Sequence, residues 1–165
     1  MFILLILMFF AGVILQCIIN LILGIIYRMK IAKILETINA KEDLLFLDCR
    51  DFVNLVAEVF RRKGCVVEIT DKCGEDGNGL IINGTKLAEV WKHGPRQAVN
   101  VEAGMKLAKC MSSNSIYKGM LITLGNFKPI TKHFCYANVI ECVGGERLLQ
   151  MCKEVQRKVP LQQVQ

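Results

Sequence analysis

The chain has 165 residues, which allows one ordinary domain and a short appendage. Apolar side chains make up 53% of the residues, an unusually high share for a water-soluble protein. The formal net charge is +6, from 21 Lys and Arg against 15 Asp and Glu, which excludes a strongly acidic surface. A modest basic excess favours a negatively charged partner, nucleic acid or anionic lipid, but only weakly.

The first segment, residues 2–27, is a predicted transmembrane helix. No charged residue occurs between Phe2 and Tyr27, and the only strongly polar residues there are Gln16 and Asn20. A helix needs about 20 apolar residues to cross the hydrocarbon core, and it satisfies its own backbone groups there. The competing interpretation is a cleaved signal peptide, but the chain lacks the basic start and the small-residue cleavage site of such a peptide.

Three basic residues follow this segment directly: Arg28, Lys30 and Lys33. Positive residues beside a membrane helix stay on the cytoplasmic side. The sequence therefore predicts a single-pass protein of the cell membrane with its C-terminal domain in the cytoplasm.

The membrane segment also carries a stripe of small and polar residues spaced four apart: Gly12, Gln16, Asn20 and Gly24. Small residues let membrane helices approach closely, and amides form hydrogen bonds across the contact. The stripe favours a homo-oligomer. The alternative is that a long anchor tolerates two amides by chance.

Residues 28–43 are predicted as a juxtamembrane helix or linker with one apolar face, formed by Ile31, Ile34, Leu35 and Ile38. The following helix has Asp51 as its expected N-cap, an apolar stripe from Phe52 to Phe60, and Gly64 as its stop.

Beyond Gly64 the chain alternates between strands and helices. Strands are expected at residues 65–70, 80–82, 85–92, 116–124 and 139–143. Asn83-Gly84 is a strong hairpin signal between the second and third of them. Helices are expected at residues 99–111, 128–137 and 146–155, and residues 157–165 are expected to form a flexible tail. The order αβββαβαβα predicts an α/β fold, a mixed sheet flanked by helices on both faces, over residues 44–156.

The eight cysteines show no Cys-x-x-Cys spacing, so a structural zinc site is not predicted. A disulfide framework belongs to small exported domains. Most of the cysteines are therefore expected to be small, buried apolar residues.

The soluble part resembles the Mrr-type restriction endonuclease domain, which has a restriction-endonuclease-like fold. The resemblance rests on the helix ending at Gly64, the hairpin at residues 74–92, the segment Gly119-Met-Leu-Ile-Thr-Leu-Gly-Asn-Phe127 and the closing Gly-Gly-Glu-Arg-Leu-Leu149. It implies DNA as partner, endonuclease activity in restriction or defence, and Mg²⁺ as cofactor if the site is active.

The metal-site motif of that family is incomplete in this hairpin. Its aspartate precedes an apolar triplet, and aligning that triplet with Leu80-Ile81-Ile82 puts Gly79 at the aspartate position. In the family's Gln/Glu-x-Lys motif, Lys92 then matches the lysine and Val90 stands at the acceptor position. The resemblance therefore implies that cleavage is lost or weakened.

A rearranged catalytic site would use Glu58, Asp76, Glu89 and Lys92, with Asp76 and Glu89 as metal ligands. Because side chains alternate along a strand, Glu89 should face away from Lys92, unless a bulge rotates it back. The alternative for each of these acids is an ordinary solvated charge.

DNA binding without cutting is the second use of this region. Candidate phosphate contacts are Lys92, His93, Arg96, Lys106 and Lys109, and Trp91 and Tyr117 are candidate stacking partners. The rival hypothesis is a protein-interaction or assembly module on a membrane anchor that kept the nuclease fold without its chemistry.

Overall fold

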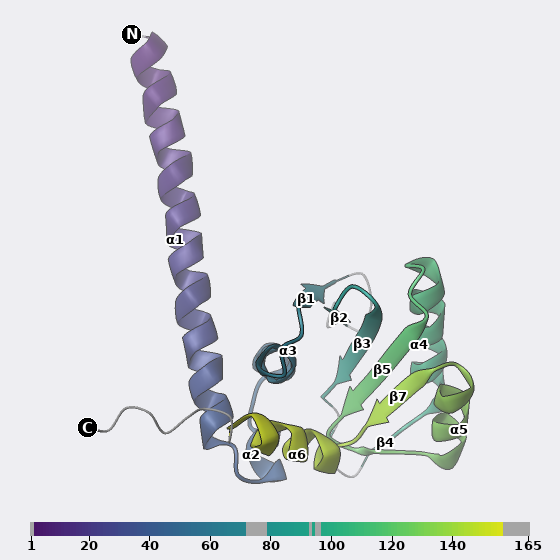
Figure 1. The fold of residues 1–165 in the computed structure, drawn as a ribbon. Helices are drawn as coiled ribbons and strands as arrows, with labels where there is room; N and C mark the ends of the chain where they lie inside the picture. The colour runs from purple at the N-terminus through teal and green to yellow at the C-terminus, as the bar shows by residue number, and fades with distance from the viewer. Residues whose placement is uncertain (1, 72–78, 93, 95–96, 157–165) are drawn as a thin grey trace.

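The computed structural model describes residues 2–71, 79–92, 94 and 97–156, and side chains from residue 12 onward together with Phe10 (Figure 1). Its helices are α1 (Phe2–Thr37), α2 (Lys41–Leu45), α3 (Cys49–Arg62), α4 (Val101–Ser113), α5 (Pro129–Ala137) and α6 (Gly145–Gln156). Its strands are β1 (Val67–Thr70), β2 (Gly79–Ile82), β3 (Lys86–Trp91), β4 (Ala98–Val99), β5 (Lys118–Thr123), β6 (Asn126–Phe127) and β7 (Ile140–Val143).

The main sheet has five strands in the order β1-β2-β3-β5-β7. The first three strands are antiparallel neighbours, and β3, β5 and β7 run parallel, with α4 and α5 in the crossovers. The predicted mixed sheet and its element order are confirmed. A second sheet, the parallel pair β4-β6, was not predicted, because strands of two residues carry no periodic signal.

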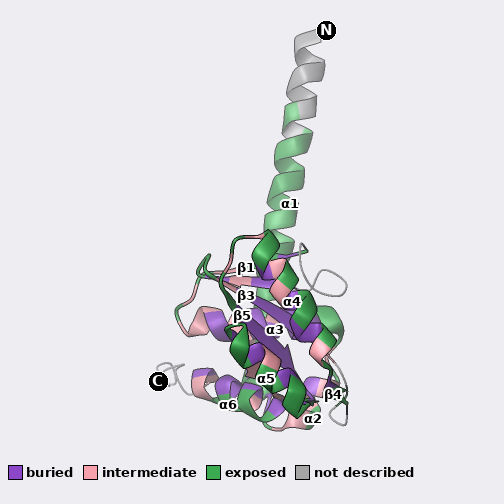
Figure 2. Ribbon diagram, turned by 90° about the vertical axis from the view of Figure 1, so that its right-hand side faces the viewer, coloured by how far each residue is buried: buried purple, intermediate pink, exposed green. Residues whose placement is uncertain are grey.

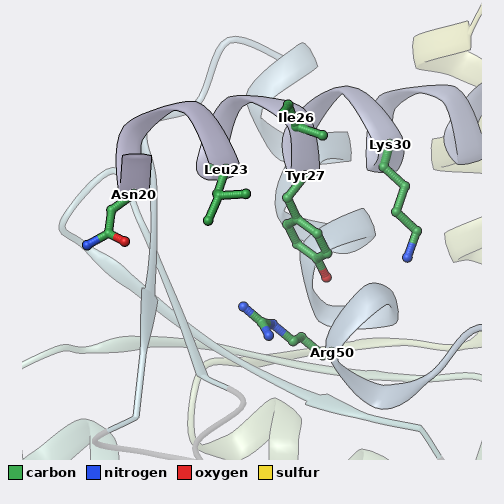
Figure 3. Close-up of a pocket in the computed structure, with 7 residues that line it drawn as sticks. Asn20, Leu23, Ile26, Tyr27, Lys30 and Arg50 are labelled. Carbon is green, nitrogen blue, oxygen red and sulfur yellow. The ribbon is translucent and has the colours of Figure 1, made fainter. Parts of the chain in front are cut away.

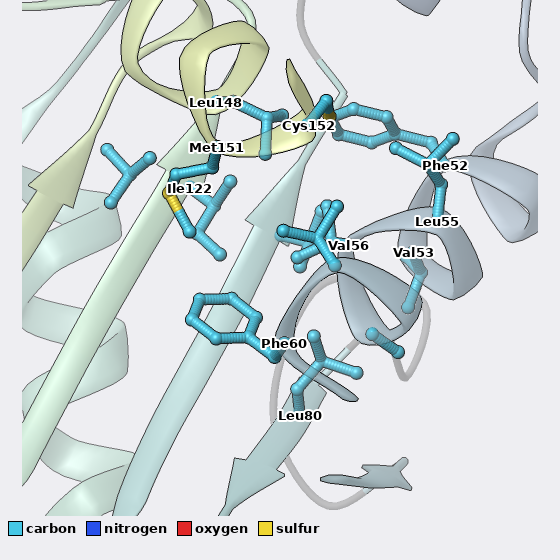
Figure 4. Packing of buried hydrophobic residues seen from close by; sticks show 14 of the residues in the cluster. Phe52, Val53, Leu55, Val56, Phe60, Leu80, Ile122, Leu148, Met151 and Cys152 are labelled. Carbon is cyan, nitrogen blue, oxygen red and sulfur yellow. The ribbon is translucent and has the colours of Figure 1, made fainter. Parts of the chain in front are cut away.

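Helices cover both faces of the sheet and divide the core into two clusters. On one face, α1, α3 and α6 pack against Leu80, Ala88, Val90 and Ile122 (Figure 4). On the other, α4 and α5 pack against Leu87 and Leu121. The alternation of Leu87, Ala88 and Val90 between the clusters follows from the strand period of two.

The N-terminal helix is continuous and has two different environments. From Gly12 to Ile26 it stands clear of the domain and is exposed (Figure 2). One face of its last turns is buried in the core, where Ile31, Leu35 and the following Ile38 are at most 2% exposed. Gln156 Nε2 at the end of α6 donates hydrogen bonds to the carbonyls of Leu35 and Ile38, which lack helical partners. The segment expected as a juxtamembrane helix or linker is thus part of α1 and of the domain core.

Asp51 joins α1 to α3. Its carboxylate accepts hydrogen bonds from Tyr27 Oη at 2.6 Å and from Lys30 Nζ at 2.8 Å. Burial acts to raise the pKa of Asp51, but the bonds from Lys30 and Tyr27 outweigh it and hold this pKa below 3.8. The prediction that Asp51 is the N-cap of α3 is wrong: Asp48 is the N-cap, and its Oδ1 accepts the Asp51 backbone N–H at 2.6 Å.

The cysteine prediction was only partly right. Within the described part of the chain, Cys135 and Cys152 are buried, and the other free thiols are half-buried or exposed. Burial raises the pKa of Cys152 to about 12, so this thiol stays protonated. Cys110, however, is disulfide-bonded, which the sequence spacing did not indicate.

If the end of α1 belongs to the core, Leu35→Ala will destabilise the whole domain. Leu35 is fully buried, so the substitution should lower the free energy of unfolding by about 2–5 kcal/mol. The measurement is thermal unfolding of the full-length protein in mild detergent. The matched control is Leu21→Ala, on the exposed part of α1, which should leave the unfolding midpoint unchanged. Equal effects of the two substitutions would contradict the core position of α1.

Candidate functional site

The hairpin β2-β3 is the element in which the metal-site motif is expected, and its turn determines which side chains share a face. Asn83 and Gly84 both have positive φ, 52° and 66°, as a two-residue hairpin turn requires. Thr85 N–H donates to Ile82 C=O at 3.2 Å and closes that turn. Asparagine and glycine are the residues that tolerate this left-handed backbone, so the predicted turn is confirmed.

The strand ladder is shifted by one residue relative to that turn. Ile82 pairs with Lys86, so Thr85 is an extra residue on the β3 side, and Gly79 pairs with Glu89. A two-residue turn without the extra residue would pair Gly79 with Ala88. A shift of one residue transfers every side chain of the strand to the other face.

Glu89 therefore lies on the same face as Gly79, and Val90 does not. Thr70 pairs with Gly79, so Thr70, Gly79 and Glu89 form one transverse row at the end of β1, β2 and β3, which we call the hairpin row. Thr70 and Glu89 are both buried, and Glu89 is only 2% exposed. Along β3, the next residue on the same face as Glu89 is Trp91, two positions further on.

Lys92 follows β3 on the opposite side. Its Nζ donates a hydrogen bond to the backbone carbonyl of Leu47, in the connection between α2 and α3. Leu47 packs against the cluster that contains Val90. Glu89 and Lys92 therefore point to opposite faces of the sheet, as the alternation of side chains along a strand predicts. The extra residue Thr85 does not bring the two side chains together.

Glu58 lies in a third place. Its carboxylate pairs with Arg62 Nε at 3.3 Å and with Arg61 at 4.0 Å, and Arg62 also pairs with Glu36 of α1. Glu58 thus contributes to the α1–α3 contact on the face of the sheet opposite Glu89. Asp76 lies outside the described residues. Of the four residues proposed for a rearranged site, the structure brings no two of Glu58, Glu89 and Lys92 together.

A small pocket of about 220 Å³ lies between the end of β3 and the start of α4. Trp91, Asn100, Glu102 and Lys106 are among the residues that line it. Lys106 Nζ is 5.9 Å from the centroid of the Trp91 ring, a distance typical of a cation–π contact.

Of the candidate DNA contacts, the structure places Lys106 and Lys109 on α4, three residues apart and both exposed. His93 and Arg96 lie outside the described residues, and Lys92 is held by Leu47. Tyr117 is exposed and directly precedes the start of β5, whose first residue pairs with Lys86. Trp91 pairs with Thr123, at the other end of β5. The two aromatic side chains therefore lie at opposite ends of the sheet.

A mixed sheet whose antiparallel hairpin leads into parallel crossovers, with the sequence motifs placed on that hairpin, defines the restriction-endonuclease-like class of fold. The comparison with protein families agrees, since residues 44–152 match the family model Mrr_cat, described as restriction endonuclease. This match covers more than half of the chain, and the chain belongs to that family. The domain is therefore a nuclease-like module of the restriction or defence type. A search of curated proteins and a search of solved structures each returned no match.

Restriction-endonuclease-like domains generally use divalent metal ions, so the hairpin row can be tested for its fit to one. A hard cation such as Mg²⁺ is held by carboxylates and its own waters. In the hairpin row, Glu89 supplies one carboxylate and Gly79 supplies none. Over the described ranges, no group of three or more His, Cys, Asp or Glu side chains is placed to hold a metal. The one carboxylate among the described residues of this row is too few to hold the ion.

Sequence reasoning missed that Glu89, and not Val90, is the residue opposite Gly79. The strand register could have been counted from the Asn83-Gly84 turn, but that count pairs Gly79 with Ala88 and not with Glu89. No residue type in the hairpin marks Thr85 as the extra residue. Trp91 was named only as a stacking candidate, and its position after Glu89 on the same face was not recognised for the same reason.

Gly79→Asp should create a divalent cation site, because it places a second carboxylate opposite Glu89. Without metal, two adjacent carboxylates repel each other, so the variant should unfold at a lower temperature than wild type. Mn²⁺ at a hundred times its Kd should then stabilise the variant by about 2.7 kcal/mol. The measurement is thermal unfolding of the full-length protein with and without Mn²⁺.

The matched control is the double variant Gly79→Asp/Glu89→Gln, which should show no saturable response to Mn²⁺. A saturable response of the wild-type protein that disappears with Glu89→Gln alone would contradict the loss of the metal site.

Proposed function

We propose that this chain is a membrane-anchored member of the Mrr restriction endonuclease family whose domain binds DNA in the cytoplasm, with cleavage lost or weakened. The hairpin row is the observation that carries the proposal. Metal-dependent cleavage needs a cation that polarises the phosphate and lowers the pKa of the attacking water. With Gly79 opposite Glu89, the described part of the hairpin offers only one of the two carboxylates that would hold it.

Retained DNA binding is supported by the basic side chains of α4. Lys106 and Lys109 lie on one exposed face, and Lys106 is held over Trp91 beside the pocket. Lysine contacts to phosphates do not need the metal, so they survive the loss of the carboxylate. The Trp91 ring holds Lys106 and packs against the cluster that contains Leu107, so the lysines, and not this ring, carry the proposal.

The proposal predicts salt-dependent binding of duplex DNA that is weakened by Lys106→Gln/Lys109→Gln. Each lysine–phosphate contact contributes about 1 to the slope of log affinity against log salt, so the double variant should reduce that slope by about 2. The measurement is fluorescence anisotropy of labelled DNA titrated with full-length protein over a series of salt concentrations.

The control for this experiment is Lys153→Gln on α6, whose lysine is exposed but lies across the sheet. Binding that is absent at low salt, or that does not weaken as salt rises, would contradict the DNA proposal and favour the protein-interaction module.

Membrane anchoring is supported by the length and composition of α1. Within Gly12–Thr37, the 18-residue window that meets the test has a mean hydropathy of 1.9, and none of that window is buried by the rest of the described chain. A signal sequence passes the same test. The continuation of α1 into the domain core favours retention, because cleavage after the apolar segment would interrupt a single helix whose end is buried.

The cytoplasmic side is supported by the basic residues Arg28, Lys30 and Lys33 and by the free thiols of the domain. The disulfide bond of Cys110 is the opposing observation, because disulfides are a feature of exported proteins. Self-association through Gly12, Gln16, Asn20 and Gly24 belongs to the same proposal. All four are exposed, and Gln16 Nε2 donates to Asn20 Oδ1 at 3.3 Å, so the two amides point the same way.

The anchor predicts that alkaline carbonate leaves the full-length protein in membranes and that detergent releases it. In sealed membrane vesicles with the cytoplasmic side outward, added protease should digest the domain. Vesicles of the opposite orientation are the control and should protect it. Release by carbonate would contradict the anchor, and protection in the first vesicles would contradict the cytoplasmic side.

A further inference from the structure

A second pocket lies where α1 leaves the domain, between α1 and the start of α3. It has a volume of about 540 Å³ and is lined by Asn20, Leu23, Ile26, Tyr27, Lys30 and Arg50, with Gly24 in its wall (Figure 3). All of these residues except Arg50 come from one face of α1. Arg50 is supplied by the first turn of α3 and faces that helix from the domain.

The pocket changes character along its length. Beyond the Asn20 amide at one end, Leu23 and Ile26 are apolar and exposed, and at the other end Lys30 and Arg50 carry positive charge. From Asn20 to Lys30 the helix rises about 15 Å, which is about half the thickness of a hydrocarbon core. If α1 spans a bilayer, the apolar end faces acyl chains and the charged end lies at the level of the headgroups.

The cations at the charged end are held in place but not all neutralised. The Arg50 guanidinium lies 5.2 Å from the centroid of the Tyr27 ring, and Tyr27 Oη donates to Asp51. Asp51 is paired with Lys30, but within the described residues no carboxylate lies at ion-pair distance from Arg50. A planar guanidinium beside an aromatic ring is suited to bind a phosphate through two parallel hydrogen bonds.

We propose that this pocket binds an anionic phospholipid of the surrounding leaflet, with the phosphate at Arg50, beside the Lys30–Asp51 pair, and one acyl chain along Leu23 and Ile26. The inference rests on the membrane anchor proposed above. An amphipathic pocket continuous with the membrane segment fits a lipid, because one molecule then satisfies both its apolar and its charged end. The bound headgroup links α1 to α3 at the site where Asp51 already joins them.

The test uses full-length protein in mild detergent, incubated with phosphatidylglycerol or with phosphatidylcholine of the same acyl chains. Native mass spectrometry counts the lipids retained on each protein. Wild type should retain phosphatidylglycerol in preference to phosphatidylcholine, and Arg50→Gln should reduce that preference about fivefold. Arg147→Gln, which alters an exposed arginine on α6, is the matched control and should leave the preference unchanged. A large excess of inorganic phosphate should not displace the lipid.

Several results would overturn the proposal. Equal retention of the two lipids, or an unchanged preference in Arg50→Gln, would exclude a specific headgroup site. Displacement by inorganic phosphate would identify a site for free anions. A mass of two chains without bound lipid would indicate that the self-association proposed for α1 extends over the pocket and excludes the lipid. Carbonate extraction separates this test from the anchor: a protein that stays in the membrane without lipid preference disproves the pocket proposal alone.

Discussion

The burial of the last turns of α1 in the domain core is the contact on which the rest of this structure depends. Ile31, Leu35 and Ile38 fill space between α3 and α6, and Gln156 bonds to carbonyls at the end of α1. Around them, Asp51 receives Lys30 and Tyr27, and Arg62 bridges Glu36 and Glu58. The apolar and polar parts of this contact support each other, so the end of the apolar helix is packed into the nuclease fold.

Two residues that resemble catalytic ones have structural partners on the face of the sheet that α1 and α3 cover. Glu58 is an acid on the first helix of a nuclease fold, but its arginine partners hold it at the α1–α3 interface. Lys92 ends the strand of the expected lysine motif, but its ammonium group is bound by the Leu47 carbonyl. Glu58 and Lys92 are thus held on the α1–α3 face of the sheet, away from Glu89.

Much of the fold could be predicted because its elements carry strong local signals: the stripe from Phe52 to Phe60, the stop at Gly64 and the turn at Asn83-Gly84. The helix start was misassigned by three residues, because Asp48 and Asp51 are equally good caps and only the position of Lys30 and Tyr27 distinguishes them. The site was less predictable. Its geometry depends on one extra residue, Thr85, and a register shift of this kind is determined by the pairing of whole strands, which single residue types do not encode.

The unbroken course of α1 has a mechanical consequence. At 1.5 Å per residue, 36 residues extend about 54 Å, of which a bilayer occupies about 30 Å. No flexible linker separates the domain from this helix, so every tilt of α1 in the lipid turns the sheet by the same angle. If α1 is inserted, the domain diffuses in two dimensions and meets only those DNA segments that pass close to the lipid surface.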